Sequence, residues 1–166
     1  MKITKQFIAE IKILALQNKK ENATFFRQVG AKPPGRVYEA FQNLHEKVFA
    51  EADCLDCGNC CKSLGPKLNS ADIRRISGVL RIKASEFEQK YLRLDEDKDT
   101  VFKIMPCAFL SEDNTCIIYE DRPRACREYP HTNQRKMHQV LDSTLKNISV
   151  CPAVFEIVER LKKVKI

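Results

Sequence analysis

The sequence predicts a mainly α-helical protein with a small β-hairpin, folded as a compact single domain stapled by cysteine-ligated metal. Three observations predict this. Apolar residues recur at helical spacing, β-branched and aromatic residues gather in one short region, and eight cysteines lie at joints between the expected elements. The 166 residues suit one domain. We expect residues 1–53 to form a helical region, within that domain or as a cap on it, and residues 54–166 to form a cysteine-cluster domain.

Two amphipathic helices are expected before the first cysteine. Their apolar positions are Phe7, Ile11 and Leu14 in the first helix, and Val37, Phe41, Leu44 and Val48 in the second. Between them, the glycines and prolines of "GAKPPG" stop one helix and start the next. The two helices are therefore expected to form an antiparallel pair.

Two more helices are expected between the cysteines, at residues 70–80 and 84–94. Asn69 or Ser70 can cap the first of them. The apolar positions are Ile73, Ile76 and Leu80 in the first, and Phe87, Tyr91 and Leu94 in the second. With the turn between them, these two helices could also form a helix-turn-helix, since residues 70–94 carry six basic and three acidic residues.

The helical period then gives way to a strand-like composition. The segments "TVFKIMPCAFL" and "CIIY" flank the polar turn "SEDNT", which predicts a β-hairpin. After it, Asp121 can cap a short helix with Pro123 in its first turn and Pro130 at its end. Pro152 starts a final helix, "CPAVFEIVERLKK", and residues 131–150 fit no single pattern.

Composition excludes several classes of protein. Lys5, Glu10 and Lys12 interrupt the first twenty residues, so this stretch is expected to be neither a signal peptide nor a membrane span. We therefore expect a cytoplasmic protein without a membrane partner, in which cysteines bind metal or catalyse rather than form disulfides. The formal charge of +7 is spread almost evenly along the chain, so it indicates no particular partner.

The stretch "CLDCGNCC", residues 54–61, holds half of the cysteines. Separations of two residues let a tight loop aim several sulfurs at one centre, as in zinc knuckles and iron–sulfur loops. Bacterial ferredoxin loops share this spacing, except that their fourth cysteine follows after three residues, whereas Cys61 follows Cys60 directly. Neighbouring side chains tend to diverge, so these two cysteines are expected to serve different metals, or one of them to lie beside the ligands.

The other four cysteines lie at element boundaries, where metal ligands connect one element to the next. Cys151, at the start of a helix, should also feel the helix dipole, which favours its thiolate. Eight cysteines would fill two four-sulfur sites; the predicted metal ligands are Cys54, Cys57, Cys60, Cys61, Cys107, Cys116, Cys126 and Cys151. Redox disulfides and inert buried thiols are the alternatives, and for Cys107 or Cys126 taken alone an inert thiol is preferred.

The motifs "CLDCGNCC", "PCAFL", "CIIYEDRPRACREYP" and "CP" occur in the order of the YkgJ-like CxxCxxCC cysteine-cluster family, and from Cys54 to Pro152 the chain resembles it. The resemblance implies a bacterial domain that chelates zinc or iron. All eight cysteines occupy its expected positions, and Arg122, Pro123, Arg127 and Pro130 match its second motif. Arg122 and Arg127 are predicted to lie beside the ligands, donating hydrogen bonds to sulfur and offsetting negative charge.

The metal and the function stay open at this stage. Zinc would form closed structural sites, whereas iron, alone or in an iron–sulfur cluster, could transfer electrons or support a reaction. A metal-binding module of unassigned role is the first hypothesis. The second is a metal-dependent enzyme related to the flagellin lysine N-methylases, which carry a similar motif, although no catalytic residue can be named. A nucleic-acid-binding helix-turn-helix is disfavoured because its turn, "VLRIKA", lacks glycine, and an unknown protein partner stays open.

Overall fold

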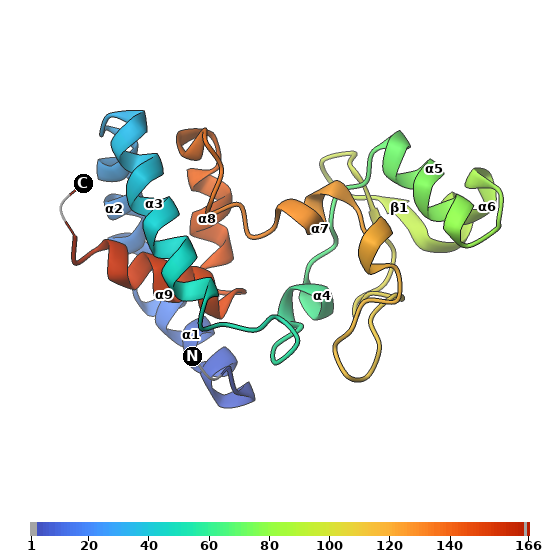
Figure 1. Ribbon diagram of the computed structural model, residues 1–166, viewed down its shortest axis with the longest axis horizontal. Coiled ribbons are helices and arrows are strands. Elements are labelled where there is room, and N and C mark those ends of the chain that lie inside the picture. Colours follow the sequence, from blue (N-terminus) through green and yellow to red (C-terminus); the bar gives the residue numbers. More distant parts are fainter. Residues whose placement is uncertain (1–2, 165) are drawn as a thin grey trace. The chain divides into compact units, whose positions relative to one another are not determined.

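The computed structural model of the protein describes residues 3–164 and 166 (Figure 1). Mainly helical architecture with one two-stranded antiparallel sheet is confirmed. The chain divides into two compact units, which we call the helical unit (Met1–Cys57 and Pro130–Ile166) and the cysteine-rich unit (Gly58–Tyr129). Two separate apolar clusters form, one within each unit, so each unit has a core of its own. The expected organisation into one domain, with residues 1–53 as part of it or as a cap, stays a prediction.

The helical unit joins the start of the chain to its end. Its elements are α1 (Lys5–Gln17), α2 (Lys19–Gly30), α3 (Pro34–Phe49), the 3₁₀ turn η2 (Met137–Gln139), α8 (Leu141–Asn147) and α9 (Pro152–Leu161). In the described stretch from residue 3 to the first cysteine, the chain forms three helices rather than the expected two. The extra boundary is at Asn18, which ends α1 by donating its N–H to Leu14 O at 2.9 Å and precedes α2. No glycine or proline marks this break.

The core of the helical unit lies where α3 packs against α9. All four apolar positions expected on α3 are buried. They meet the buried side chains of α9, which include Val154, Ile157, Val158 and Leu161. Both helices begin with a proline, Pro34 and Pro152, whose missing N–H costs nothing in a first turn. The predicted start of the final helix is confirmed.

The cysteine-rich unit is built from shorter elements. These are α4 (Asn59–Ser63), α5 (Ser70–Val79), α6 (Ala84–Tyr91), β1 (Leu92–Leu94), β2 (Thr100–Phe102), the 3₁₀ turn η1 (Tyr119–Asp121) and α7 (Arg124–Glu128). The predicted cap of α5 is confirmed as a capping box. Asp72 N donates to Asn69 Oδ1 at 2.9 Å, and Asn69 N donates to Asp72 Oδ2 at 3.2 Å.

The β-hairpin lies earlier in the chain than expected. β1 and β2 pair with Leu92 opposite Phe102, and the predicted helix ends at Tyr91 instead of continuing to residue 94. Asp95 Oδ1 accepts the N–H groups of residues 97 and 99, which closes the loop between the strands. Around "SEDNT" the pairing is limited to an isolated bridge between Leu110 and Cys116 and two hydrogen bonds, from the Ser111 N–H to the Thr115 carbonyl at 2.9 Å and from the Ile117 N–H to the Phe109 carbonyl at 3.0 Å.

The short helix that carries Cys126 also begins later than expected. Pro123, not Asp121, stands at the N-cap of α7, and Asp121 belongs to the preceding 3₁₀ turn. A carboxylate does cap this helix, but it comes from α5: Asp72 Oδ1 accepts the Arg124 N–H at 3.1 Å. Among the described residues, no helix combines the length and apolar character needed to cross a membrane.

Candidate metal-binding site

Five of the eight cysteines belong to the cysteine-rich unit, namely Cys60, Cys61, Cys107, Cys116 and Cys126. We call them the thiol cluster. Cys60 and Cys61 lie on α4, whose N-cap is Gly58 with a left-handed φ of 55°. A Cβ at Gly58 would lie 2.8 Å from Asn114 Oδ1. Both the backbone conformation and the close approach therefore favour glycine at position 58, two residues before Cys60.

The sulfurs of Cys60 and Cys61 lie 3.9 Å apart. The expected divergence of these neighbouring side chains is therefore not found. Two sulfurs bound to one tetrahedral zinc ion, each at about 2.3 Å, lie about 3.8 Å from each other. The observed separation is thus close to that of two ligands of one ion, and the assignment to two different metals stays a prediction.

Cys107 and Cys116 are brought to the same region by backbone hydrogen bonds. The Cys107 N–H donates to the Cys61 carbonyl at 2.9 Å, which ties the segment after β2 to α4. The Leu110 N–H donates to the Cys107 carbonyl at 3.0 Å, and Leu110 bridges to Cys116 across the "SEDNT" turn. The predicted turn therefore has a role in the site, since it returns the chain from Cys107 to Cys116.

Cys126 completes the thiol cluster from α7. Burial raises the pKa of the Cys126 thiol to about 12, and the charges of Cys61, Cys107 and Cys116 raise it further. Burial likewise raises the pKa values of Cys107 and Cys116. These thiols share a partly buried environment in which their negative charges oppose one another. Without a cation, several thiolates would not coexist there.

Cys61 differs from its neighbours in the cluster. A hydrogen bond with Cys60 lowers the pKa of the Cys61 thiol to about 7, burial opposes this, and the charges of Lys62 and Arg122 lower it further. The first thiolate of the cluster is therefore expected at Cys61. A thiolate is the form that binds metal.

Arg122 is a basic side chain that acts on several thiols of the cluster. Its guanidinium carbon lies 3.7 Å from the centroid of the Tyr119 ring, and its Nη1 donates to the Tyr119 carbonyl at 3.1 Å. Its positive charge lowers the pKa values of three thiols, those of Cys61, Cys116 and Cys126. Arg127 is exposed on α7, and its predicted place beside the ligands stays a prediction.

The other three cysteines, Cys54, Cys57 and Cys151, belong to the helical unit. The Cys57 N–H donates to the Cys54 carbonyl at 3.1 Å, and Cys151 is the N-cap of α9. Burial raises the pKa of Cys151 to about 11, and the N–H groups of residues 154 and 153 only partly counter this. The helix start acts as predicted on Cys151, but burial outweighs it.

The donor chemistry of the cysteines fits zinc or iron, because both metals are bound by cysteine thiolates in proteins. In the part of the chain that the structure describes, no three His, Cys, Asp or Glu side chains are placed as ligands of one metal ion. The thiols of the cluster lie in one region, but they are not arranged around a single point as the ligands of one ion would be. His45 is occupied elsewhere: its Nδ1 lies 2.8 Å from Thr132 Oγ1, and its ring stacks on Phe49.

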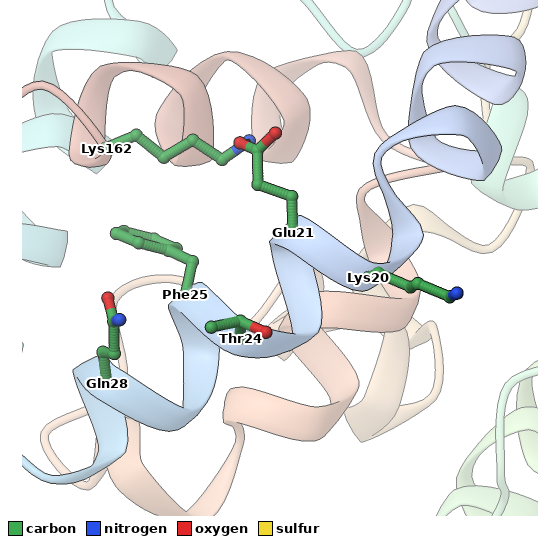
Figure 2. Close-up of a pocket in the computed structure, with 6 residues that line it drawn as sticks. All are labelled: Lys20, Glu21, Thr24, Phe25, Gln28 and Lys162. Atoms are coloured by element: carbon green, nitrogen blue, oxygen red, sulfur yellow. The ribbon is translucent and has the colours of Figure 1, made fainter.

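A surface pocket of about 490 Å³ lies in the helical unit, between α2 and α9 (Figure 2). Its lining consists of Lys20, Glu21, Thr24, Phe25, Gln28 and Lys162. Figure 2 shows Glu21 and Lys162 reaching toward each other, and their charged groups form an ion pair at 2.9 Å. None of the lining residues is a cysteine, so the pocket is not part of the thiol cluster.

Sequence reasoning missed two residues next to the site, Asp72 and Arg75. The spacing of Asn69 and Asp72 signals a capping box, which would have identified the carboxylate as a helix cap. Nothing in the sequence links it to α7, because that contact spans 52 positions.

Comparison with known proteins gives three findings. The family model described as "CxxCxxCC: Putative zinc- or iron-chelating domain" matches residues 53–151, more than half of the chain. A relative from Methanocaldococcus jannaschii, "Uncharacterized protein MJ0661", is 33% identical over 87 residues, which cover 49% of this chain and 45% of the relative. The chain therefore spans less than half the length of that relative. No solved structure matches the chain.

Proposed function

Since the chain belongs to the CxxCxxCC family of zinc- or iron-chelating domains, we propose that it is a metal-binding protein whose thiol cluster holds zinc or iron. The observation that carries this proposal is the gathering of five thiols within 72 residues of one compact unit. The 3.9 Å separation of the Cys60 and Cys61 sulfurs and the direct tie between Cys107 and Cys61 support it.

We first assign four ligands: Cys126 and the three cysteines whose charges act on its thiol, which are Cys61, Cys107 and Cys116. Cys60 lies beside this set and can replace one of its members. Cys54, Cys57 and Cys151 form a separate group in the helical unit and keep their assignment as predicted ligands. A bound metal would supply folding energy as zinc, or electron transfer as iron.

The same proposal includes metal as a staple of the cysteine-rich unit. Its two strands have three residues each, which is too little to stand alone, and α4 and α7 have five residues each. The cysteines lie on or beside these short elements. Ligation would link α4, the "SEDNT" turn and α7 to one centre.

A nucleic-acid-binding role receives less support. Arg75, one of the basic residues of the expected helix-turn-helix, is engaged within the unit, where its Nη2 donates to Asp72 Oδ1 at 2.7 Å. Its positive charge is thus balanced by a buried carboxylate. This supports a structural use of that residue over phosphate contact.

Elemental analysis of the protein, purified without oxygen and without a metal-binding tag, tests the proposal. We expect at least one equivalent of zinc or iron per chain, with its loss when Cys61 and Cys116 are both changed to Ser. Iron with a matching amount of acid-labile sulfide would assign a cluster; zinc would assign a closed structural site. Protein without either metal, and unable to take up either one when reduced, would overturn the proposal.

A further inference from the structure

A buried ion pair lies on α5, beside the thiol cluster but outside it. The Asp72 side chain is 2% exposed, and its Oδ1 lies 2.7 Å from Arg75 Nη2. A buried carboxylate is costly unless it is paired and hydrogen-bonded. The capping box uses only Asp72 Oδ2, which accepts the Asn69 N–H. It does not explain why Oδ1 is buried and paired with Arg75.

Both side chains reach the segment that leads into α7. Arg75 donates from Nε to the Asp121 carbonyl at 3.3 Å and from Nη2 to the Arg122 carbonyl at 2.9 Å. Asp72 Oδ1 accepts the Arg124 N–H at 3.1 Å. Three of four consecutive backbone positions are therefore held by two side chains from a distant part of the sequence. We call these contacts the α5 brace.

The segment held by the α5 brace carries two groups that act in the thiol cluster. Cys126 follows it within α7, two residues after the held N–H of Arg124. The Arg122 side chain lies over the Tyr119 ring, and its charge acts on Cys61, Cys116 and Cys126. Moving residues 121–124 would thus move one thiol and the cluster's nearby positive charge together.

We propose that Asp72 and Arg75 are positioning residues of the metal site, which fix residues 121–124 so that the Cys126 thiol and the Arg122 guanidinium stay beside the other thiols. This inference rests on the proposed function. Outer partners of metal ligands usually matter to affinity by about 10- to 100-fold. If the α5 brace were only a structural ion pair, its removal would destabilise the fold. As a positioning device, its removal should weaken metal binding even in protein that remains folded.

The experiment compares Arg75→Gln and Asp72→Asn with Arg74→Gln, which removes an equal charge from an exposed neighbour on α5. Zn²⁺ is the probe, and its dissociation constant is measured by competition with a chromogenic chelator under reducing conditions. We expect binding about 10- to 100-fold weaker in Arg75→Gln and Asp72→Asn, and a change below about twofold in Arg74→Gln. Arg75→Lys keeps the charge but not the planar fork, so an intermediate loss is expected.

A second measurement needs no metal. Hydrogen exchange of the metal-free proteins should be faster at the Arg124 and Cys126 amides in Arg75→Gln than in wild type, with the amides of α9 unchanged. Wild-type zinc affinity in Arg75→Gln, or unchanged exchange at Arg124, would overturn the positioning role while the proposed function stands. A wild-type protein that binds no zinc and contains no iron would overturn the proposed function instead, and the positioning role with it.

Discussion

At the scale of single residues, the site is set by what stands next to each thiol. Cys61 and Cys126 belong to the same cluster, yet one has a pKa of about 7 and the other of about 12. The difference comes from their partners: Cys61 has the Cys60 thiol and two cations nearby, whereas burial dominates at Cys126. A bound metal ion would lower the pKa of every thiol around it, including the buried ones, because its positive charge favours the thiolate. The buried cysteines are thus the ones that gain most from a bound cation.

Asp72 should make the cysteine-rich unit sensitive to acid. Burial raises the pKa of its carboxyl, but hydrogen bonds from Arg75, Asn69 and Arg124 outweigh burial and hold the pKa below its ordinary value. Because the folded pKa is the lower one, Asp72 contributes stability that is present above about pH 4 and is lost as the pH falls through the folded pKa. The other carboxyl facing Arg75 is that of Asp121, at 4.0 Å.

Urea unfolding of wild type and Asp72→Asn between pH 7 and pH 2.5 measures this contribution. We expect the free energies of unfolding to differ most near pH 7 and to converge as the pH falls below about 4. Asp113→Asn is the comparison: Asp113 also has a lowered pKa, but it is exposed and bound within its own turn, so solvent screening should make its pH-dependent contribution smaller than that of Asp72. A wild-type advantage over Asp72→Asn that persists unchanged at pH 2.5 would contradict this role.

At the scale of elements, the capping box of α5 gives a prediction with a known size. Asn69→Ala removes the acceptor for the Asp72 N–H and should cost about 1 kcal/mol of unfolding free energy in the cysteine-rich unit. Asn69→Asp keeps an acceptor and should cost much less. Urea titrations monitored by circular dichroism supply the comparison, and equal stability of Asn69→Ala and wild type would contradict the capping role.

Element prediction succeeded where local chemistry decides and failed where distant contacts decide. The cap at Asn69, the apolar face of α3 and the helix start at Pro152 each depend on neighbouring residues, and all three are confirmed. The hairpin was misplaced because Leu92 and Phe102 enter one core with Phe87, a contact no local pattern encodes. The start of α7 was misplaced because its capping carboxylate comes from α5.

For the candidate site too, the sequence predicts what local patterns carry and misses what depends on distant contacts. Spacing and resemblance pick out all eight cysteines as candidate ligands, and five of them lie in one unit of the structure. The sequence could not show that Cys60 and Cys61 would hold their sulfurs 3.9 Å apart, because that depends on the rotamers within α4. It also could not show that the Arg122 guanidinium lies over the Tyr119 ring, because that contact depends on how the folded chain places the two side chains.

At the scale of the whole molecule, the two units should differ in their dependence on metal. Among the residues that the structure describes, the core of the helical unit has 14 buried residues, contributed largely by long helices, whereas the core of the cysteine-rich unit has eight. A unit with so small a core gains most from additional stabilisation, which the proposed metal would supply. Removing metal should therefore destabilise the cysteine-rich unit first.

Hydrogen exchange monitored by mass spectrometry, before and after chelation under reducing conditions, can separate the units. Amides of α4, α5 and α7 should lose protection after metal removal, while those of α3 and α9 keep theirs. At a metal concentration of about 1,000 times the dissociation constant, binding adds about 4 kcal/mol to the free energy of unfolding. Removing the metal should therefore lower the melting temperature of a unit of this size by about 15 °C or more. Equal loss of protection in both units would show that the helical unit also depends on metal, through Cys54, Cys57 and Cys151. Unchanged protection everywhere, with metal loss verified, would contradict the stapling role, because a ligand that binds only the folded unit must stabilise it.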